Sequence, residues 1–155
     1  MACRQGGMPT PTRSVSVDCS PKVDGLPEPT VLQAIYSVLD GEGTEAAEFS
    51  VAFLSGQRMR ALNRRLFAQD RATDVIAFGL PHPDVLVGDI YVCPSVVRRV
   101  ARELKVPEQQ ELIRMIVHGT LHSIGYDHPA GDGRYRSEMW SKQEGYVDNI
   151  VRGLA

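Results

Sequence analysis

The sequence predicts a single α+β domain, in which about four strands form a mixed sheet packed against four to five helices. Its length of 155 residues is that of one ordinary domain. Its content of 43% hydrophobic and 23% charged residues is typical of a globular protein. Segments of strand-like and helix-like hydrophobic periodicity follow one another without an internal repeat. We expect a flexible N-terminal arm over residues 1–12 and one metallohydrolase-like domain over residues 13–155.

Two strand–helix pairs are expected in the first half of the chain. Alternating polar and apolar residues predict a strand over 14–18. Pro29 suits the first turn of a helix that ends at Gly41. A second strand is expected over 49–54, and Ser55 is a suitable N-cap for the helix that follows.

The middle of the chain predicts two more strands, over 74–78 and 85–92, which are separated by a turn at 81–84. A helix over 95–104 follows, and its basic face is interpreted as solvated surface, with RNA contact as the alternative. Three arginines form this face: Arg98, Arg99 and Arg102.

The C-terminal third predicts two helices joined by a loop. The first begins at Pro107, has a broad apolar face and should stop at Gly125. A loop is expected over 126–133, and a final helix over 137–154. This region also carries most of the histidines.

Composition excludes several classes of protein. The longest apolar stretch, residues 75–80, is far shorter than the roughly 20 residues of a membrane span. The three cysteines form no CxxC pair, and the first residues lack the apolar segment of a signal peptide. The net charge of −2 gives no overall attraction to nucleic acid, although a local basic cleft remains compatible with it. We therefore expect a soluble cytoplasmic protein with no membrane partner.

Three of the four histidines fall within eleven residues, at His118, His122 and His128. His118 and His122 are four residues apart on the predicted helix, so they project from one face. Gly125 allows the backbone to reverse and bring His128 beside them. Three imidazoles with an open fourth position for water are typical of a catalytic zinc site. His82, in a proline-flanked turn, is interpreted as an ordinary packing residue.

The same histidine spacing occurs in metzincin peptidases, whose pattern is HExxHxxGxxH. Position 119 is glycine here, where those enzymes carry their general-base glutamate. Without that carboxylate, peptide hydrolysis by the usual route lacks its proton acceptor. A metallopeptidase is therefore the weaker alternative.

Residues 118–128 resemble, without a mismatch, the HGxLHxxGYDH signature of the YbeY family of bacterial rRNA-maturation endoribonucleases. The resemblance implies one zinc ion per chain, held by His118, His122 and His128, whose bound water would do the catalytic work. It also implies cleavage of single-stranded rRNA in 16S rRNA 3′-end maturation and ribosome quality control, with the small subunit or assembly factors as partners. Further similar segments span roughly residues 50–150: Leu62-Asn63, Thr73-Asp74-Val75, Phe78, Gly88-Asp89-Ile90, Met139 and Gln143-Glu144.

The chain departs from this family's pattern at Phe67, where members usually carry an arginine that lines the cleft. Arg64 could present a guanidinium on a similar helix face and bind substrate, or it could be a solvated surface residue. Ala77 also replaces a common serine. Because the usual arginine is missing, a non-catalytic, metal-stabilised ribosome-assembly factor is the main alternative to the nuclease.

Three aspartates near these motifs have open or structural interpretations. Asp127 could orient an imidazole or cap the loop backbone. Asp74 and Asp89 are expected to organise loops rather than act as general bases.

Overall fold

The structure, a computed structural model, describes residues 12–18, 26–81 and 84–154. The strands of these residues are β1 (Arg13–Asp18), β2 (Ala47–Phe53), β3 (Val75–Pro81) and β4 (Leu86–Val92). They form one sheet in the order β1-β2-β4-β3, and only β3 runs antiparallel to its neighbour. The sheet is therefore mixed, as predicted. The expected arm over residues 1–12 lies outside the described residues except for Thr12, as does His82.

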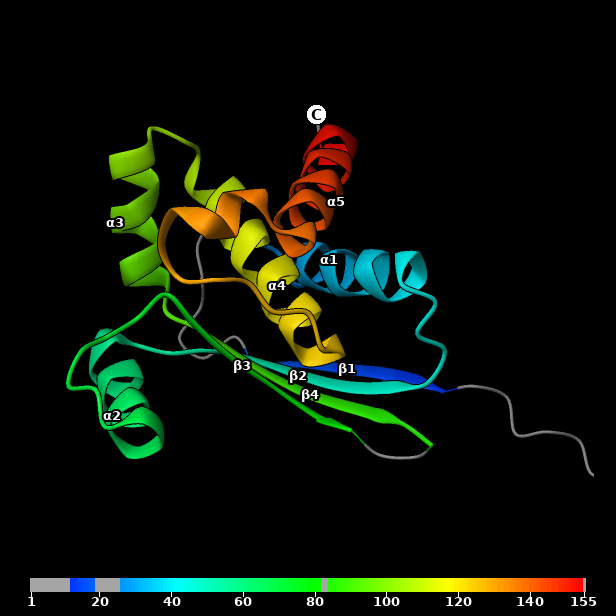
Figure 1. Ribbon diagram of the computed structural model, residues 1–155, viewed down its shortest axis with the longest axis horizontal. Helices are drawn as coiled ribbons and strands as arrows, with labels where there is room; N and C mark the ends of the chain where they lie inside the picture. The colour runs from blue at the N-terminus through cyan, green and yellow to red at the C-terminus, as the bar shows by residue number, and fades with distance from the viewer. Residues whose placement is uncertain (1–11, 19–25, 82–83, 155) are drawn as a thin grey trace, which may run out of the picture.

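Helices cover this sheet mainly on one side (Figure 1), where α4 packs on the strands, with α1 beside it and α5 above it in this view. The helices of the described residues are α1 (Glu28–Gly41), α2 (Gly56–Phe67), α3 (Pro94–Leu104), α4 (Glu108–Ile124), the short 3-10 helix η1 (Gly131–Arg136) and α5 (Glu138–Leu154). The predicted α+β class is confirmed. None of these helices is long and apolar enough to cross a membrane.

Most predicted elements lie within two or three residues of the observed ones, and Ser55 caps α2 by accepting a hydrogen bond from the Arg58 amide at 3.3 Å. The expected loop over 126–133 is wrong at its end, because η1 occupies 131–136. This segment shows no apolar periodicity. Its Tyr135 packs edge-to-face on Trp140 of α5, with ring centroids 4.7 Å apart. The helical turn is therefore accompanied by a contact with another helix.

The central helix α4 is surrounded by other elements, since it contacts β3, β4, α1, α3 and α5. Its apolar residues Leu112, Ile113, Ile116, Val117 and Leu121 are fully buried. Such close-packed surroundings leave a helix little freedom to shift. Polar side chains on α4 are therefore presented from a rigid support.

Strand β3 docks against the C-terminal end of α4 through a glycine. A Cβ at Gly79 would lie 2.0 Å from the Ser123 carbonyl oxygen, so only glycine permits this approach. The Ser123 hydroxyl donates to the Phe78 carbonyl at 3.0 Å and holds the two elements together. As a result, the start of β3 passes close to the histidines of α4.

Helix α2 stands apart from the main core. In Figure 1 it lies at the opposite side of the sheet from α1 and α5. A second, smaller hydrophobic cluster anchors it, made by Leu54, Met59, Ile76, Cys93 and Val96.

Candidate metal centre

Helix α4 presents His118 and His122 one turn apart, as the spacing predicts. The helix ends at Gly125, which has φ +123°, a backbone conformation that favours glycine. The chain then reverses and returns His128 to the first two histidines. The ligand atoms of the three residues all lie within 4.8 Å of one another. The structure thus brings together all three predicted ligands.

Each imidazole is oriented by a hydrogen bond at Nδ1. His118 Nδ1 lies 2.7 Å from Gln143 Oε1, and His122 Nδ1 lies 2.9 Å from the Tyr126 carbonyl oxygen. His128 Nδ1 lies 2.9 Å from the carbonyl oxygen of Pro129. Because carbonyl oxygens only accept, each Nδ1 must carry the proton. In the neutral form of each ring, Nε2 therefore keeps its lone pair for a metal.

Burial favours the neutral, metal-binding form of His118 and His122. It lowers the pKa of His118 from 6.5 to about 4, against the opposing effect of the Gln143 hydrogen bond and with help from the other two histidines. Burial also lowers the pKa of His122. Three imidazoles whose Nδ1 atoms are hydrogen-bonded fit a zinc ion well. The three imidazole nitrogens are therefore chemically suited to bind a metal ion.

A chain of polar side chains extends behind His118. Gln143 Nε2 donates to Glu144 at 3.3 Å, so its Oε1 must face the histidine. The Arg114 guanidinium donates to both oxygens of Glu144 at 3.0 Å, and to Glu111 at 2.6 Å. The sequence marks Gln143 and Glu144 only as family-like positions, because their contact with α4 has no local signal.

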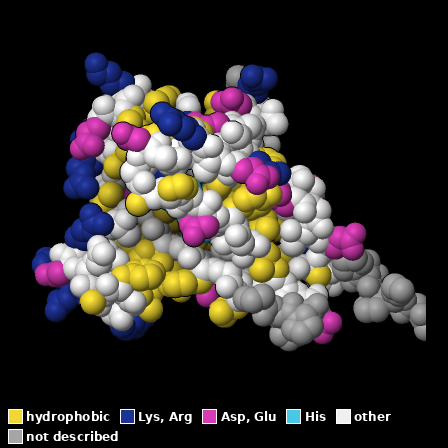
Figure 2. Space-filling view, in the orientation of Figure 1, with side chains coloured by type: hydrophobic (Ala, Val, Ile, Leu, Met, Phe, Trp, Pro, Cys, Tyr) yellow, Lys and Arg dark blue, Asp and Glu magenta, His cyan; other side chains and the backbone are white. Residues whose placement is uncertain are grey.

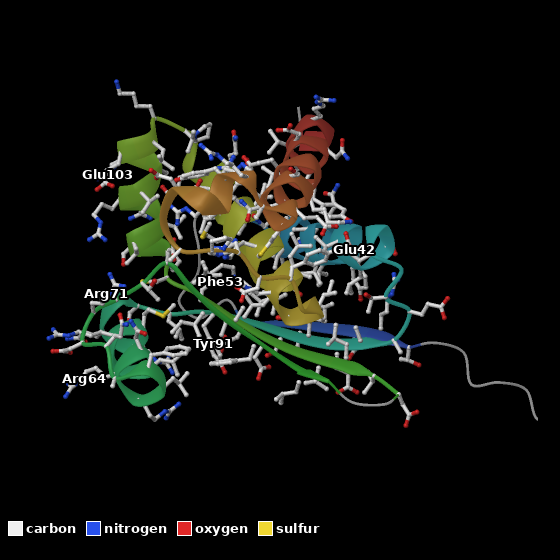
Figure 3. All side chains as sticks on the ribbon, in the orientation of Figure 1. Glu42, Phe53, Arg64, Arg71, Tyr91 and Glu103 are labelled. Carbon is white, nitrogen blue, oxygen red and sulfur yellow. The ribbon has the colours of Figure 1, made fainter. Side chains whose placement is uncertain are left out.

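The loop that carries His128 is held by Glu42, immediately after α1. The hydroxyl groups of Tyr126 and Tyr146 each donate to this carboxylate at 2.7 Å, and Lys142 donates at 3.1 Å. Figure 3 labels Glu42 near the end of α1. Asp127 Oδ1 accepts from the His128 amide at 2.8 Å, so Asp127 caps the loop backbone. The importance of Glu42 could not be read from the sequence, because its partners are at least 84 residues away.

Two cavities border the histidines on different sides. The larger, about 690 Å³, is lined by His118 and His128, by the aromatic rings of Tyr135 and Trp140, and by more carboxylates than guanidinium groups. The smaller, about 340 Å³, is lined by His118 and His122. The charged residues of the larger cavity are Asp74, Glu103, Glu111, Glu144, Arg114 and Arg134.

The remaining sequence candidates are placed as follows. Arg64 is 66% exposed, lies 3.5 Å from Asp70, and lines neither cavity. Asp74 accepts from the Val75 amide at 2.8 Å and also lines the larger cavity. Asp89 accepts from the Ser50 hydroxyl at 2.6 Å. The structure does not bring Arg64 to the histidines.

Gly119 faces the sheet and lines neither cavity. A Cβ at this position would lie 2.9 Å from Ile90 Cγ2 and 3.4 Å from the Ala77 Cβ. A glutamate, as in the metzincin pattern, would therefore collide with the sheet. The helix packing thus argues against the peptidase alternative.

The sequence and the fold are similar to those of known proteins. The family described as Endoribonuclease YbeY matches residues 23–151. Endoribonuclease YbeY of Thermotoga maritima is 41% identical over 101 residues, which are 65% of this chain and 66% of the relative, just under two thirds of its length. Its counterpart from Chloroherpeton thalassium is 34% identical over 122 residues, 79% of this chain and 85% of the relative.

A solved structure is also similar. The solution structure of TM1509 from Thermotoga maritima aligns with a TM-score of 0.62 and 30% identity, over 92% of this chain and 90% of that one. The family match covers strands β2, β3 and β4 and the helix and loop that carry the three histidines. On these grounds the chain belongs to the family of endoribonuclease YbeY.

Proposed function

We propose that this chain is a zinc-dependent endoribonuclease that hydrolyses phosphodiester bonds of single-stranded RNA. The observation that carries the proposal is the set of Nδ1 hydrogen bonds, which leaves the Nε2 atoms of His118, His122 and His128 available to one metal. Three neutral imidazoles with an open fourth position are typical of catalytic rather than structural zinc.

The protein's own residues prepare this site. Zinc, when bound, supplies Lewis-acid activation of water and of a phosphoryl oxygen. Gln143 fixes the tautomer and ring plane of His118, and Glu144 with Arg114 fixes Gln143. Two of the histidines also border the smaller cavity, so a strand bound there could place one phosphate beside them.

The substrate follows from the family. Relatives named endoribonucleases support RNA as the substrate. We further propose action on the 3′ end of 16S rRNA and in ribosome quality control, with the small subunit or assembly factors as partners, in the cytoplasm. Local charge also favours RNA. Lys and Arg side chains gather along the edge formed by α2 and α3 (Figure 2), and α2 carries four arginines and no acidic residue.

A second candidate is a metal-stabilised ribosome-assembly factor that binds RNA without cleaving it. The observation in its favour is Phe67, an uncharged ring on the wall of the smaller cavity, at a position where family members usually carry arginine. A missing cation would weaken stabilisation of charge on a reacting phosphate.

Cleavage assays separate these candidates. The zinc-loaded chain is incubated with a labelled single-stranded precursor of the 16S rRNA 3′ end and with a duplex control. We expect wild-type cleavage of the single strand, its loss with a chelator, and its return with zinc. His118→Ala, His122→Ala and His128→Ala should each abolish cleavage, because two imidazoles hold zinc poorly.

His82→Ala is the matched control, since it removes the fourth histidine of the chain, and it should cleave as wild type does. Circular dichroism checks that each variant is folded. Folded triad variants that cleave at the wild-type rate would disprove the zinc-nuclease proposal. Metal-loaded wild type that binds the RNA and leaves it intact would favour the assembly factor.

A further inference from the structure

We propose that Phe67 and Arg71 form a nucleotide subsite in the smaller cavity, where the Phe67 ring stacks on a nucleobase and the Arg71 guanidinium binds a phosphate. This inference rests on the proposed function, since it takes RNA as the substrate. The cavity of about 340 Å³ is walled by both residues and by His118 and His122. A nucleotide held in this cavity would be next to the nucleotide whose phosphate lies at the metal centre.

Phe67 has the geometry of a stacking platform. It is the last residue of α2, and its ring stacks on Phe78 with centroids 6.2 Å apart and planes inclined by 16°. Even so, 51% of the residue remains exposed. One face of the ring is thus supported while much of the ring surface is open to solvent. Single-stranded nucleic acids bind such aromatic faces by base stacking with little dependence on sequence.

Among the described residues that line this cavity, Arg71 is the one arginine, and no lysine or carboxylate accompanies it. Its Nε donates to the neutral Gln69 Oε1 at 3.2 Å, and no described carboxylate lies within ion-pair distance of its guanidinium. By contrast, Arg60 and Arg64 both contact Asp70. Arg71 therefore keeps guanidinium donors for a phosphate, which it can bind in a bidentate manner.

The segment that carries Arg71 is held in place by a buried amide. Asn63, only 5% exposed, donates from Nδ2 to the Arg71 carbonyl oxygen at 2.9 Å. Figure 3 labels Arg64 on α2 and Arg71 on the segment that follows it. Because Arg71 lies on the cavity wall and Arg64 does not, we infer that Arg71 provides the cation missing at position 67.

The two cavities differ in charge, and this difference indicates which of them binds the phosphate. Carboxylates outnumber guanidinium groups in the larger cavity, and Arg114 there is already paired with Glu111 and Glu144. That cavity therefore repels phosphate. The smaller cavity is lined by Arg71, by two histidines and by uncharged polar and apolar side chains, with no carboxylate among them. We assign the phosphate contact to the smaller cavity on this difference.

The test measures binding without cleavage. The zinc-loaded chain is titrated with a fluorescein-labelled 2′-O-methyl single strand across a range of salt, and a denaturing gel of each sample checks that the strand stays intact. Phe67→Ala should weaken binding about 5- to 100-fold and leave the salt dependence unchanged, because stacking is uncharged. Phe67→Trp should bind at least as tightly as wild type. Arg71→Ala should weaken binding and reduce the log–log salt slope by about 1.

Two controls make the outcome decisive. Arg65→Ala removes an exposed arginine of α2 that lines neither cavity, and it should leave affinity nearly unchanged. A strand whose bases are replaced by abasic sites should bind wild type and Phe67→Ala equally. Equal losses for Arg65→Ala and Arg71→Ala would overturn the phosphate assignment. A Phe67→Ala loss that persists on the abasic strand, or no loss at all, would overturn the stacking assignment.

Failure of this subsite is distinct from failure of the nuclease proposal. Cleavage that depends on His118 alongside unaffected binding by both variants would refute only the subsite. Weakened binding by both variants without any cleavage would refute only the nuclease.

The Phe67→Leu variant controls for lost packing, because it keeps an apolar side chain over Phe78 but lacks a ring. Phe67→Leu should unfold at the same temperature as wild type and bind the strand as weakly as Phe67→Ala.

Discussion

Gln143, on α5, lies with its side-chain oxygen 2.7 Å from Nδ1 of His118 on α4. The contact joins residues 25 positions apart in the chain, and Gln143 is 1% exposed. A buried acceptor at this distance fixes the tautomer of His118 and therefore which nitrogen faces the metal.

Gln143→Leu should reduce zinc affinity about 10- to 100-fold, because it removes the acceptor that orients His118. Competition with a chromophoric chelator measures the affinity. Gln143→Glu keeps an acceptor oxygen and should retain tighter binding than the leucine variant. Wild-type affinity in Gln143→Leu would show that the hydrogen bond does not position the ligand.

The purified chain should bind about one zinc ion through His118, His122 and His128. Elemental analysis measures the stoichiometry. Because zinc binds the folded state, saturation at about 100 times the dissociation constant should raise the free energy of unfolding by about 2.7 kcal/mol. Each His→Ala variant should lose this gain, whereas His82→Ala should keep it. If wild type purified with added zinc contained none, the predicted metal site would be disproved.

Arg64→Ala tests whether this residue contacts RNA, as the sequence suggests. A contact would lower affinity and reduce the log–log salt slope by about 1. The alternative is a surface residue, in keeping with its 66% exposure and its position near Asp70. Titration with labelled single-stranded RNA decides between them, and an unchanged affinity and slope would identify Arg64 as surface.

Glu42→Gln should destabilise the fold at neutral pH. Burial raises the pKa of Glu42, but hydrogen bonds from Tyr126, Tyr146 and Lys142 outweigh it and hold the pKa below 4.5. A lowered pKa means that the carboxylate's contribution is complete above about pH 4.5 and is lost as the pH falls through the folded-state pKa. Urea unfolding should therefore show a difference at pH 7 that shrinks in acid. Equal stability at pH 7 would contradict this role.

Gly79→Ala should destabilise the protein by about 3 kcal/mol, because the new Cβ would overlap the Ser123 carbonyl and backbone cannot yield as a side chain does. Gly145→Ala is the matched control. Gly145 lies within α5, and a Cβ added there would meet no atom within 4 Å, so alanine should stabilise the helix by about 0.5–1 kcal/mol. Denaturant unfolding measures both, and a neutral Gly79→Ala would show that β3 can move away from α4.

The local features of the metal centre could be predicted from the sequence alone. Spacing placed His118 and His122 on one helix face, and Gly125 marked the end of that helix. The strand and helix order was predicted for the same reason, since hydrophobic periodicity depends on neighbours within a turn or two of chain. The return of His128 followed from a glycine at a helix end, which is also a local signal.

The tertiary structure alone decided the partners of these residues. Gln143 behind His118, Glu42 beneath Tyr126, and Arg71 on the cavity wall are contacts or positions that no local pattern indicates. Each depends on how helices pack on the sheet, and packing brings together side chains that are 25 to 84 residues apart. Periodicity specifies which face of an element is buried, but not which residue of another element meets it. For that reason the ligands could be identified in the sequence, whereas the groups that orient them could not.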